Sequence, residues 1–248
     1  MTSIQATILG LVQGLTEFLP ISSSGHLAIL QNLFQFSEPP IAFDVLLHVA
    51  TLGAVGAFFF NDIRRINRAR MVALLAGTIP TGIIGIILEK QADWLFSSVP
   101  LLSIGFFLTT LLLLSTLLLD RVRVKTKITI NIRTAVLIGI AQGISIIPSL
   151  SRSAATIVTA LWLGVDREDA ARFSFLLSIP AILGAQLLEI PSLLTNNHVA
   201  PSSTAIGFFT AFVAGFLSLR WLMAIVKGKE LHWFALYTGA LALLLAIV

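Results

Sequence analysis

The sequence predicts an all-α polytopic membrane protein with two inverted-topology repeats. Each repeat has one re-entrant helix–loop–helix and three transmembrane helices, so six spans and two re-entrant pairs are expected. Of the 248 residues, 56% are hydrophobic and 11% are charged, against about 25% charged in soluble domains. Runs free of Asp, Glu, Lys and Arg approach the roughly 17–25 residues of a spanning helix. Two polar segments, one in each half, interrupt this apolar sequence.

The first polar segment, Gln13–His26, breaks the apolar stretch that begins the chain. From residue 2 to residue 33 the only ionisable side chains are Glu17 and His26, and both lie in it. Pro20 cannot continue a helix, and the serines and glycine that follow favour a cap. Each arm has about 15 residues or fewer and covers about 22 Å of a roughly 30 Å apolar core. We therefore expect a re-entrant pair between about residues 4 and 30.

Three spans follow at about 41–60, 71–89 and 98–119. Basic residues cluster after the first and the third span: Arg64, Arg65, Arg68, Arg70, Arg121, Arg123, Lys125 and Lys127. The intervening loop carries only Lys90. Positively charged loops mark the cytoplasmic side, so the first polar segment is expected to enter from outside.

The second half repeats this order. Residues 133–163 predict a second re-entrant pair, and spans follow at about 168–189, 203–226 and 232–248. The loop 190–202 has no Lys or Arg, whereas Lys227 and Lys229 lie in the last connection. The charges predict both termini on the outer face of a multi-pass protein of the plasma membrane.

Short matches relate the two halves. Gln13-Gly14 corresponds to Gln142-Gly143, and taking Pro20 with Pro148 aligns Ser23 with Ser151. One re-entrant pair plus three spans is an odd number of crossings, so the second copy must be inverted. The prediction is one membrane domain, 1–248, with repeats of about 1–120 and 133–248 and a binding site near the midplane.

The second polar segment, Gln142–Ser153, and the first are both suited to bind an anion. Each broken helix restarts after its proline, so free N–H groups and hydroxyls lie at a helix N-terminus. Arg152 adds a planar guanidinium that matches phosphate oxygens. The alternative is structural: the serines cap helices and Arg152 pairs with Glu17. The net charge of +4 is carried by short loops, so no nucleic-acid partner is expected.

Glu17 lies one helical turn after Gln13, so both occupy one helix face. Together they could hold a hard divalent cation or orient a water or hydroxyl; a neutral, hydrogen-bonded Glu17 is the alternative. His26 could act as an acid, a base or a nucleophile, or be structural. Asp44 and His48 are expected to pair with each other.

Three stretches carry a family resemblance. Gln13-Gly-Leu-Thr-Glu17-Phe-Leu-Pro20-Ile-Ser-Ser-Ser-Gly-His26 resembles the glutamate-rich motif of the BacA-type undecaprenyl-diphosphate phosphatases. Pro148-Ser-Leu-Ser-Arg-Ser-Ala-Ala-Thr156 resembles their second signature, PGxSRSxxT, and the stretch 43–52 resembles a third family segment. The chain departs from the family at Gln13, often Glu, and at Ser149 and Ala154, usually Gly.

The resemblance implies an integral membrane hydrolase that converts undecaprenyl diphosphate to the monophosphate and inorganic phosphate. It recycles the lipid carrier for cell-wall and peptidoglycan synthesis, which underlies bacitracin resistance. A divalent cation, Mg²⁺ or Ca²⁺, is implied, with Glu17 as its ligand. The implied catalytic residues are Glu17, Ser23, His26 and Arg152. The implied substrate-binding residues are Gln13, Ser22, Ser24, Gly25, Ser151, Ser153 and Thr156.

Several points stay open at this stage. Besides the polyprenyl diphosphate and the membrane lipid, a homodimer partner is left open. The nucleophile is Ser23, His26 or water. The competing function is a transporter or flippase of a polyprenyl phosphate, because inverted repeats with broken helices are also transporter architecture. The acid, hydroxyl and imidazole on one arm favour catalysis, since phosphate binding alone needs only donors and Arg152.

Overall fold

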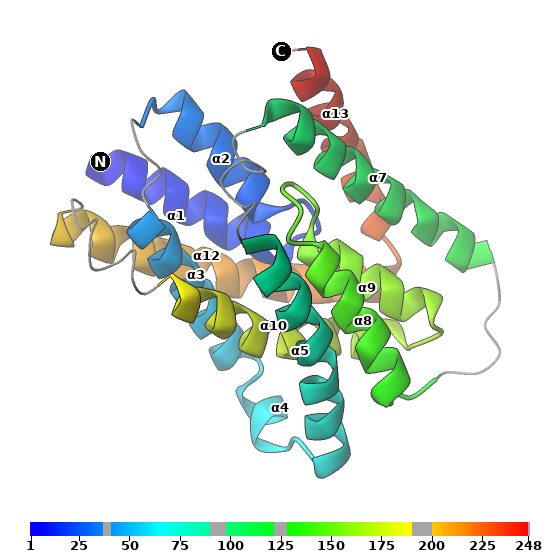
Figure 1. Cartoon of the computed structure of the whole chain (residues 1–248). Coiled ribbons are helices and arrows are strands. Elements are labelled where there is room, and N and C mark those ends of the chain that lie inside the picture. The colour runs from blue at the N-terminus through cyan, green and yellow to red at the C-terminus, as the bar shows by residue number, and fades with distance from the viewer. Residues whose placement is uncertain (37–40, 90–97, 122–127, 190–199, 248) are drawn as a thin grey trace.

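The computed structural model describes residues 1–36, 41–89, 98–121, 128–189 and 200–247. These residues form α-helices, one short 3₁₀ helix and an isolated β-bridge between Ile128 and Val165. The expected loop charges at Lys90, Arg123, Lys125 and Lys127 lie outside the described residues. The helices form one bundle in which the two polar segments lie together near the centre (Figure 1).

The first polar segment is a broken helix, as expected. Helix α1 (Ser3–Phe18) begins with a capping box between Thr2 and Gln5. The chain leaves it at Leu19, passes Pro20 and restarts as α2 (Ser23–Leu33), capped by the Ser22 side chain. A proline and a run of capping serines end one helix and start another for purely local reasons.

The next helices match the three spans expected in the first half. The three spans are α3 (Ile41–Phe58), α5 (Arg68–Glu89) and α7 (Val99–Arg121), and a short α4 (Phe60–Arg64) lies between α3 and α5. Pro80 lies inside α5 without ending it, which a long apolar helix packed among others tolerates.

The second polar segment is also broken. Helix α8 (Ile132–Ile144) starts from an Asn131 capping box, and α9 (Arg152–Trp162) starts from a Ser151 cap. Beyond it come α10 (Arg167–Leu188), α12 (Pro201–Gly228), the 3₁₀ helix η1 (Leu231–Trp233) and α13 (Phe234–Ile247).

Five helices, namely α3, α5, α7, α10 and α12, are long and apolar enough to cross a membrane. The sixth expected span, 232–248, is divided into η1 and α13, and α13 has 14 residues. Large apolar side chains such as Ile86, Leu118 and Leu243 are exposed on the outside of the bundle. The outer face is therefore suited to lipid.

Helix packing is reciprocal between the two halves. Helix α1 packs along α12 of the other half, and α8 packs along α5 (Figure 1). Both contacts depend on glycine. A Cβ on Gly10 would lie 2.5 Å from the Gly207 carbonyl oxygen, and a Cβ on Gly139 would collide with the Gly77 carbonyl oxygen. Helices α7 and α13 also pack on each other. The halves thus interlock, and each broken helix rests on a long helix of the other half.

Candidate active site

Glu17 is the centre of the site. It lies in the last turn of α1 and is 7% exposed. Its Oε2 accepts a hydrogen bond from Gln13 Nε2 at 3.1 Å and another from Ser23 Oγ at 2.5 Å. Gln13 reaches it because it lies one helical turn earlier, and Ser23 reaches it because the chain reverses at Pro20. The first polar segment therefore folds back so that its second half, at Ser23, contacts Glu17 in its first half.

Arg152 joins the second polar segment to this acid. Its Nη2 lies 2.5 Å from Glu17 Oε1, with 19% of the Arg152 side chain and 5% of the Glu17 side chain exposed. The pairing expected under the structural alternative is therefore present. Because this is the only hydrogen bond of the guanidinium among the described residues, donors remain for another anion. With three donors directed at its two oxygens, Glu17 is arranged as an ionised carboxylate.

The serines cap both restarted helices. Ser22 Oγ accepts from Gly25 N at 3.4 Å, and Ser151 Oγ accepts from Ala154 N at 3.3 Å. The expected equivalence of Ser23 with Ser151 is wrong by one residue, because the caps make Ser22 the counterpart of Ser151. Ser22 lies nine residues after Gln13, as Ser151 does after Gln142. In this register Ser23 and Arg152 are counterparts, and each is bonded to Glu17.

The two breaks touch each other under backbone strain. Ser22 and Ser149 have φ of 69° and 62°, a left-handed conformation that costs a non-glycine residue about 1–2 kcal/mol. A Cβ on Gly25 would lie 2.6 Å from Ser149 Oγ, so only glycine fits there. Ser149 Oγ is itself buried without a hydrogen-bond partner. Strain and an unpaired polar atom at the same junction are typical of functional sites.

His26 is on the same arm as Ser23 but is not bonded to it or to Glu17. Its Nδ1 lies 2.6 Å from the Ser22 carbonyl oxygen, and its Nε2 lies 2.7 Å from the Tyr237 hydroxyl. Because a carbonyl only accepts, Nδ1 carries a proton, and in the neutral imidazole Nε2 then accepts from the Tyr237 hydroxyl. The two rings stack with centroids 5.6 Å apart. Sequence reasoning missed Tyr237, the only tyrosine of the chain, because no local pattern marks it.

Asp44 and His48 are paired as expected, but the bond runs through the Asp44 backbone rather than its carboxylate. The Asp44 carboxylate accepts from Gln31 Nε2 at 3.0 and 2.8 Å. His48 donates Nδ1–H to the Asp44 backbone oxygen at 2.8 Å and turns its Nε2 to within 3.9 Å of Glu17 Oε2. The i, i+4 spacing brings the imidazole to the backbone rather than to the carboxylate. His48 is therefore a site residue, and its only sequence signal was the third family segment.

Other predicted substrate-binding residues support the site from outside. Thr156 Oγ lies 2.5 Å from Ser174 Oγ on α10 and donates to the Arg152 carbonyl oxygen at 2.8 Å. Ser153 Oγ donates to the Leu19 carbonyl oxygen at 3.3 Å and ties α9 to the first break. Ser24 Oγ lies 3.3 Å from Ser22 Oγ. These contacts hold the two breaks in register.

A cation site would have few ligands from the protein. No three His, Cys, Asp or Glu side chains of the described residues are grouped to hold a metal. Gln13 Oε1, however, is buried without a hydrogen-bond partner beside Glu17. One carboxylate and one amide oxygen fit Mg²⁺ when phosphate oxygens and waters complete the shell, its usual mode with phosphorylated substrates.

The fold and the site define a class: multi-pass helical membrane proteins with a buried acid–hydroxyl–guanidinium cluster between two broken helices. The family model described as bacitracin resistance protein BacA matches residues 6–244. The chain belongs to this BacA family.

Curated relatives are similar over nearly their whole length. The undecaprenyl-diphosphatase of Treponema denticola is 44% identical over 100% of this chain and 97% of the relative. The proteins of the same name from Carboxydothermus hydrogenoformans and Methanosphaera stadtmanae are 39% and 38% identical, over 100% and 99% of this chain and 98% of each relative. The family resemblance of the polar segments is thus confirmed.

Proposed function

We propose that this protein is a membrane hydrolase that removes the terminal phosphate of undecaprenyl diphosphate and so recycles the monophosphate lipid carrier for cell-wall synthesis. The observation that carries the proposal is the double engagement of Glu17, by Ser23 Oγ at 2.5 Å and Arg152 Nη2 at 2.5 Å. A carboxylate that is bonded by both a hydroxyl and a guanidinium supplies a base, with a nucleophile and an anion binder beside it. The relatives named undecaprenyl-diphosphatase support the substrate.

The proposed first step is attack by Ser23 Oγ on the terminal phosphorus. The Ser23 proton passes to Glu17 Oε2, with which it already shares a hydrogen bond. A new bond forms between Oγ and phosphorus while the bond to the bridging oxygen breaks, and the polyprenyl monophosphate leaves. The remaining donors of Arg152 bind the phosphoryl oxygens and stabilise the charge developing on them.

The second step is hydrolysis of the phosphoserine. A leaving phosphate monoester needs no proton at neutral pH, because its second pKa is about 6. A base for the attacking water is therefore more useful at this stage than an acid. His26 has a lone pair on Nε2, now engaged by Tyr237, and we assign it to accept the proton of a water that displaces the Tyr237 hydroxyl. The water oxygen bonds to phosphorus as the bond between phosphorus and Ser23 Oγ breaks, and Glu17 Oε2 returns its proton to Ser23 Oγ. The reaction ends with free Ser23, an ionised Glu17 and inorganic phosphate, and His26 then releases the proton of the water to solvent.

A divalent cation is part of the proposal. Glu17 and Gln13 Oε1 would hold it together with diphosphate oxygens, and it would supply additional neutralisation of the substrate's negative charge. Ser22, Ser24, Gly25 and Ser151 are proposed to bind the diphosphate at the starts of α2 and α9. Ser153 and Thr156 are proposed to position these segments through the Leu19 and Arg152 carbonyl oxygens to which they donate.

We also propose the topology that the sequence indicates: inverted repeats of about 1–120 and 133–248, six spans counting η1 with α13, and both termini outside the plasma membrane. Reciprocal packing of α1 on α12 and of α8 on α5 supports it. Transport of a polyprenyl phosphate is the weaker alternative. Nothing about transport requires a serine hydroxyl bonded to a buried carboxylate.

The test is phosphate release from undecaprenyl diphosphate by the purified full chain in detergent, with and without a chelator. The Ser23→Ala variant should lose at least about 10²-fold in rate, as removal of a catalytic group does. Ser178→Ala is the matched control, because within the part of the chain that the structure describes its hydroxyl bonds only the Phe175 carbonyl oxygen of α10. A wild-type protein that binds the lipid but releases no phosphate would overturn the proposal in favour of transport. An active Ser23→Ala variant would instead leave His26 or water as the nucleophile.

A further inference from the structure

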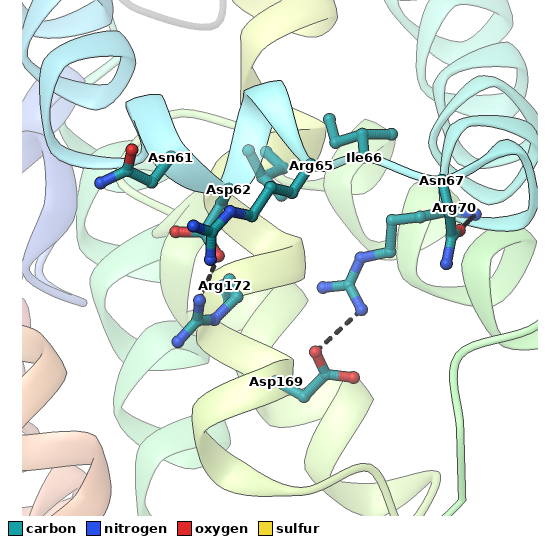
Figure 2. Close-up of a pocket in the computed structure, with 9 residues that line it drawn as sticks. Asn61, Asp62, Arg65, Ile66, Asn67, Arg70, Asp169 and Arg172 are labelled. Atoms are coloured by element: carbon teal, nitrogen blue, oxygen red, sulfur yellow. Dashed lines mark hydrogen bonds and ion pairs between the residues drawn. The ribbon is translucent and has the colours of Figure 1, made fainter.

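A polar pocket of about 340 Å³ lies at the end of α3 away from the site. From His48, which faces Glu17, α3 runs ten residues further to Phe58, about 15 Å along the helix axis. The pocket begins beyond that point, between the α4–α5 connection and the start of α10 (Figure 2). Its polar lining residues are Asn61, Asp62, Arg65, Asn67, Arg70, Asp169 and Arg172.

Both carboxylates of the pocket are already neutralised. Arg70 Nη1 binds Asp169 Oδ1 at 2.8 Å, and Arg172 binds Asp62 (Figure 2). Arg172 also binds Glu168 at 2.8 Å, and Glu168 in turn binds Lys227 at 3.1 Å. These pairs fix the positions of α4, α5, α10 and α12 around the pocket.

Positively charged donors remain after this pairing. Arg70 Nη2 is buried and has no hydrogen-bond partner, although its guanidinium is held over the Phe173 ring at 5.3 Å. Arg65 lines the pocket from the α4–α5 connection and, among the described residues, makes no ion pair or hydrogen bond through its side chain. A buried charged donor without an acceptor is costly. The pocket therefore has a net positive charge and an unfilled requirement for an acceptor.

The chemistry of these donors selects the ligand. Arg70 is held by Asp169 and the Phe173 ring, and Arg65 is exposed on the α4–α5 connection beside it. Their two guanidinium groups match the several oxygens of a phosphate group, which can accept from both. The volume is in the range of small-molecule pockets, about 300–1,000 Å³, and admits a phosphate with a small substituent. Arg64 ends α4 and Arg68 begins α5, so both flank this connection. In the proposed topology such a basic connection faces the anionic cytoplasmic leaflet. A phosphate group would reach the pocket either on a lipid headgroup or as the free ion.

We propose that this pocket is a second phosphate-binding site, formed by Arg65 and Arg70 at the opposite end of α3 from Glu17. Its ligand is the phosphate group of an anionic phospholipid or inorganic phosphate. The site is independent of the proposed hydrolysis, because neither arginine contacts the residues around Glu17.

Two probes test it on the full chain in neutral detergent: radiolabelled inorganic phosphate and radiolabelled dihexanoyl phosphatidylglycerol, each titrated at constant ionic strength by equilibrium dialysis. The key variant is Arg65→Gln, which breaks no ion pair. Arg64→Gln is the matched control, since it removes the same charge from the neighbouring residue, which packs on Phe60 at 5.6 Å and does not line the pocket. Binding around Glu17 contributes equally to both variants.

For at least one of the two probes, Arg65→Gln should raise the dissociation constant roughly tenfold or more relative to Arg64→Gln. This is the effect of losing a charge-assisted hydrogen bond. If the difference is seen with phosphatidylglycerol, the source is a headgroup; if it is seen only with phosphate, the source is the free ion. Equal binding by the two variants for both probes, or no binding by the wild type, would overturn the proposal.

Discussion

At the scale of single residues, the site depends on the groups that donate hydrogen bonds to Glu17. Its two oxygens accept from Gln13, Ser23 and Arg152, and His48 approaches to 3.9 Å. A carboxylate with several donors is held in one orientation, with the Ser23 hydroxyl already directed at it. Arg152 therefore has two roles: one nitrogen orients the acid, and the others are free for phosphate.

Arg152→Lys tests this double role. An ammonium can pair with Glu17 but cannot also present a planar fork to the phosphoryl group. We expect the lysine variant to fold and yet lose at least about 10²-fold in kcat/KM, a loss comparable with that of Arg152→Ala. The measurement is phosphate release at subsaturating substrate. Turnover close to wild type in the lysine variant would show that a point charge is sufficient.

Tyr237 is a second residue whose role can be measured. Tyr237→Phe keeps the ring stacked on His26 and removes only the hydroxyl, which the attacking water is proposed to displace. Since a neutral hydrogen bond contributes about 0.5–1.5 kcal/mol, the rate of phosphate release should change by less than about tenfold. Tyr237→Ala should cost more, because the stacking is lost too. A hundredfold loss in the phenylalanine variant would instead make the hydroxyl a participant in the reaction.

At the scale of elements, each broken helix is held by close contact with a long helix of the other half. The α8–α5 contact brings Gly139 against the Gly77 backbone, and the α1–α12 contact brings Gly10 against Gly207. Helices in membranes associate through small residues that let backbones approach. These contacts set the depth at which the breaks, and so Glu17 and Arg152, face each other.

Gly139→Ala should therefore destabilise the fold, because the added methyl group collides with backbone that cannot rotate away. We expect a lower melting temperature, with about 1–3 kcal/mol lost as for other overpacked sites. Gly184→Ala is the control: it is also a glycine inside a helix, but a Cβ there meets nothing within 4 Å. Thermal unfolding in detergent, followed by tryptophan fluorescence, compares the two. Equal melting temperatures would mean that α8 and α5 can separate without cost.

At the scale of the whole molecule, the proposed topology determines which end of the bundle meets the cytoplasm. The polar pocket at the α4–α5 connection would then face the cytoplasm, and the start of α12 would face the outside of the cell. The chain contains no cysteine, so single introduced cysteines report on accessibility without background.

Ala69→Cys and Ser202→Cys test this arrangement, because both positions are exposed and lie near opposite ends of spans. In intact cells an impermeant maleimide should label the Ser202 variant, and it should label the Ala69 variant only after the membrane is opened. Labelling of both variants from outside, or the reverse pattern, would contradict the inverted repeat.

Some features follow from sequence alone because they depend on composition and local rules. The apolar composition predicted a membrane protein, and Pro20 with its serines predicted the break between α1 and α2. The same rules predicted the break before Arg152, and the family motif named Glu17, Ser23 and Arg152. Helix propensity, capping and hydrophobic length act over a few residues, so a single sequence contains them.

Only the tertiary structure decided which side chains meet. Glu17 and Arg152 are 135 residues apart, and His26 and Tyr237 are 211 apart; neither spacing carries a local signal. The structure also shows that His48 bonds the Asp44 backbone and turns its other nitrogen toward Glu17. The helix caps make Ser22, rather than Ser23, the counterpart of Ser151. The physical reason is that long-range contacts depend on how helices pack, here through glycine contacts between halves, and packing is a property of the assembled molecule rather than of any segment.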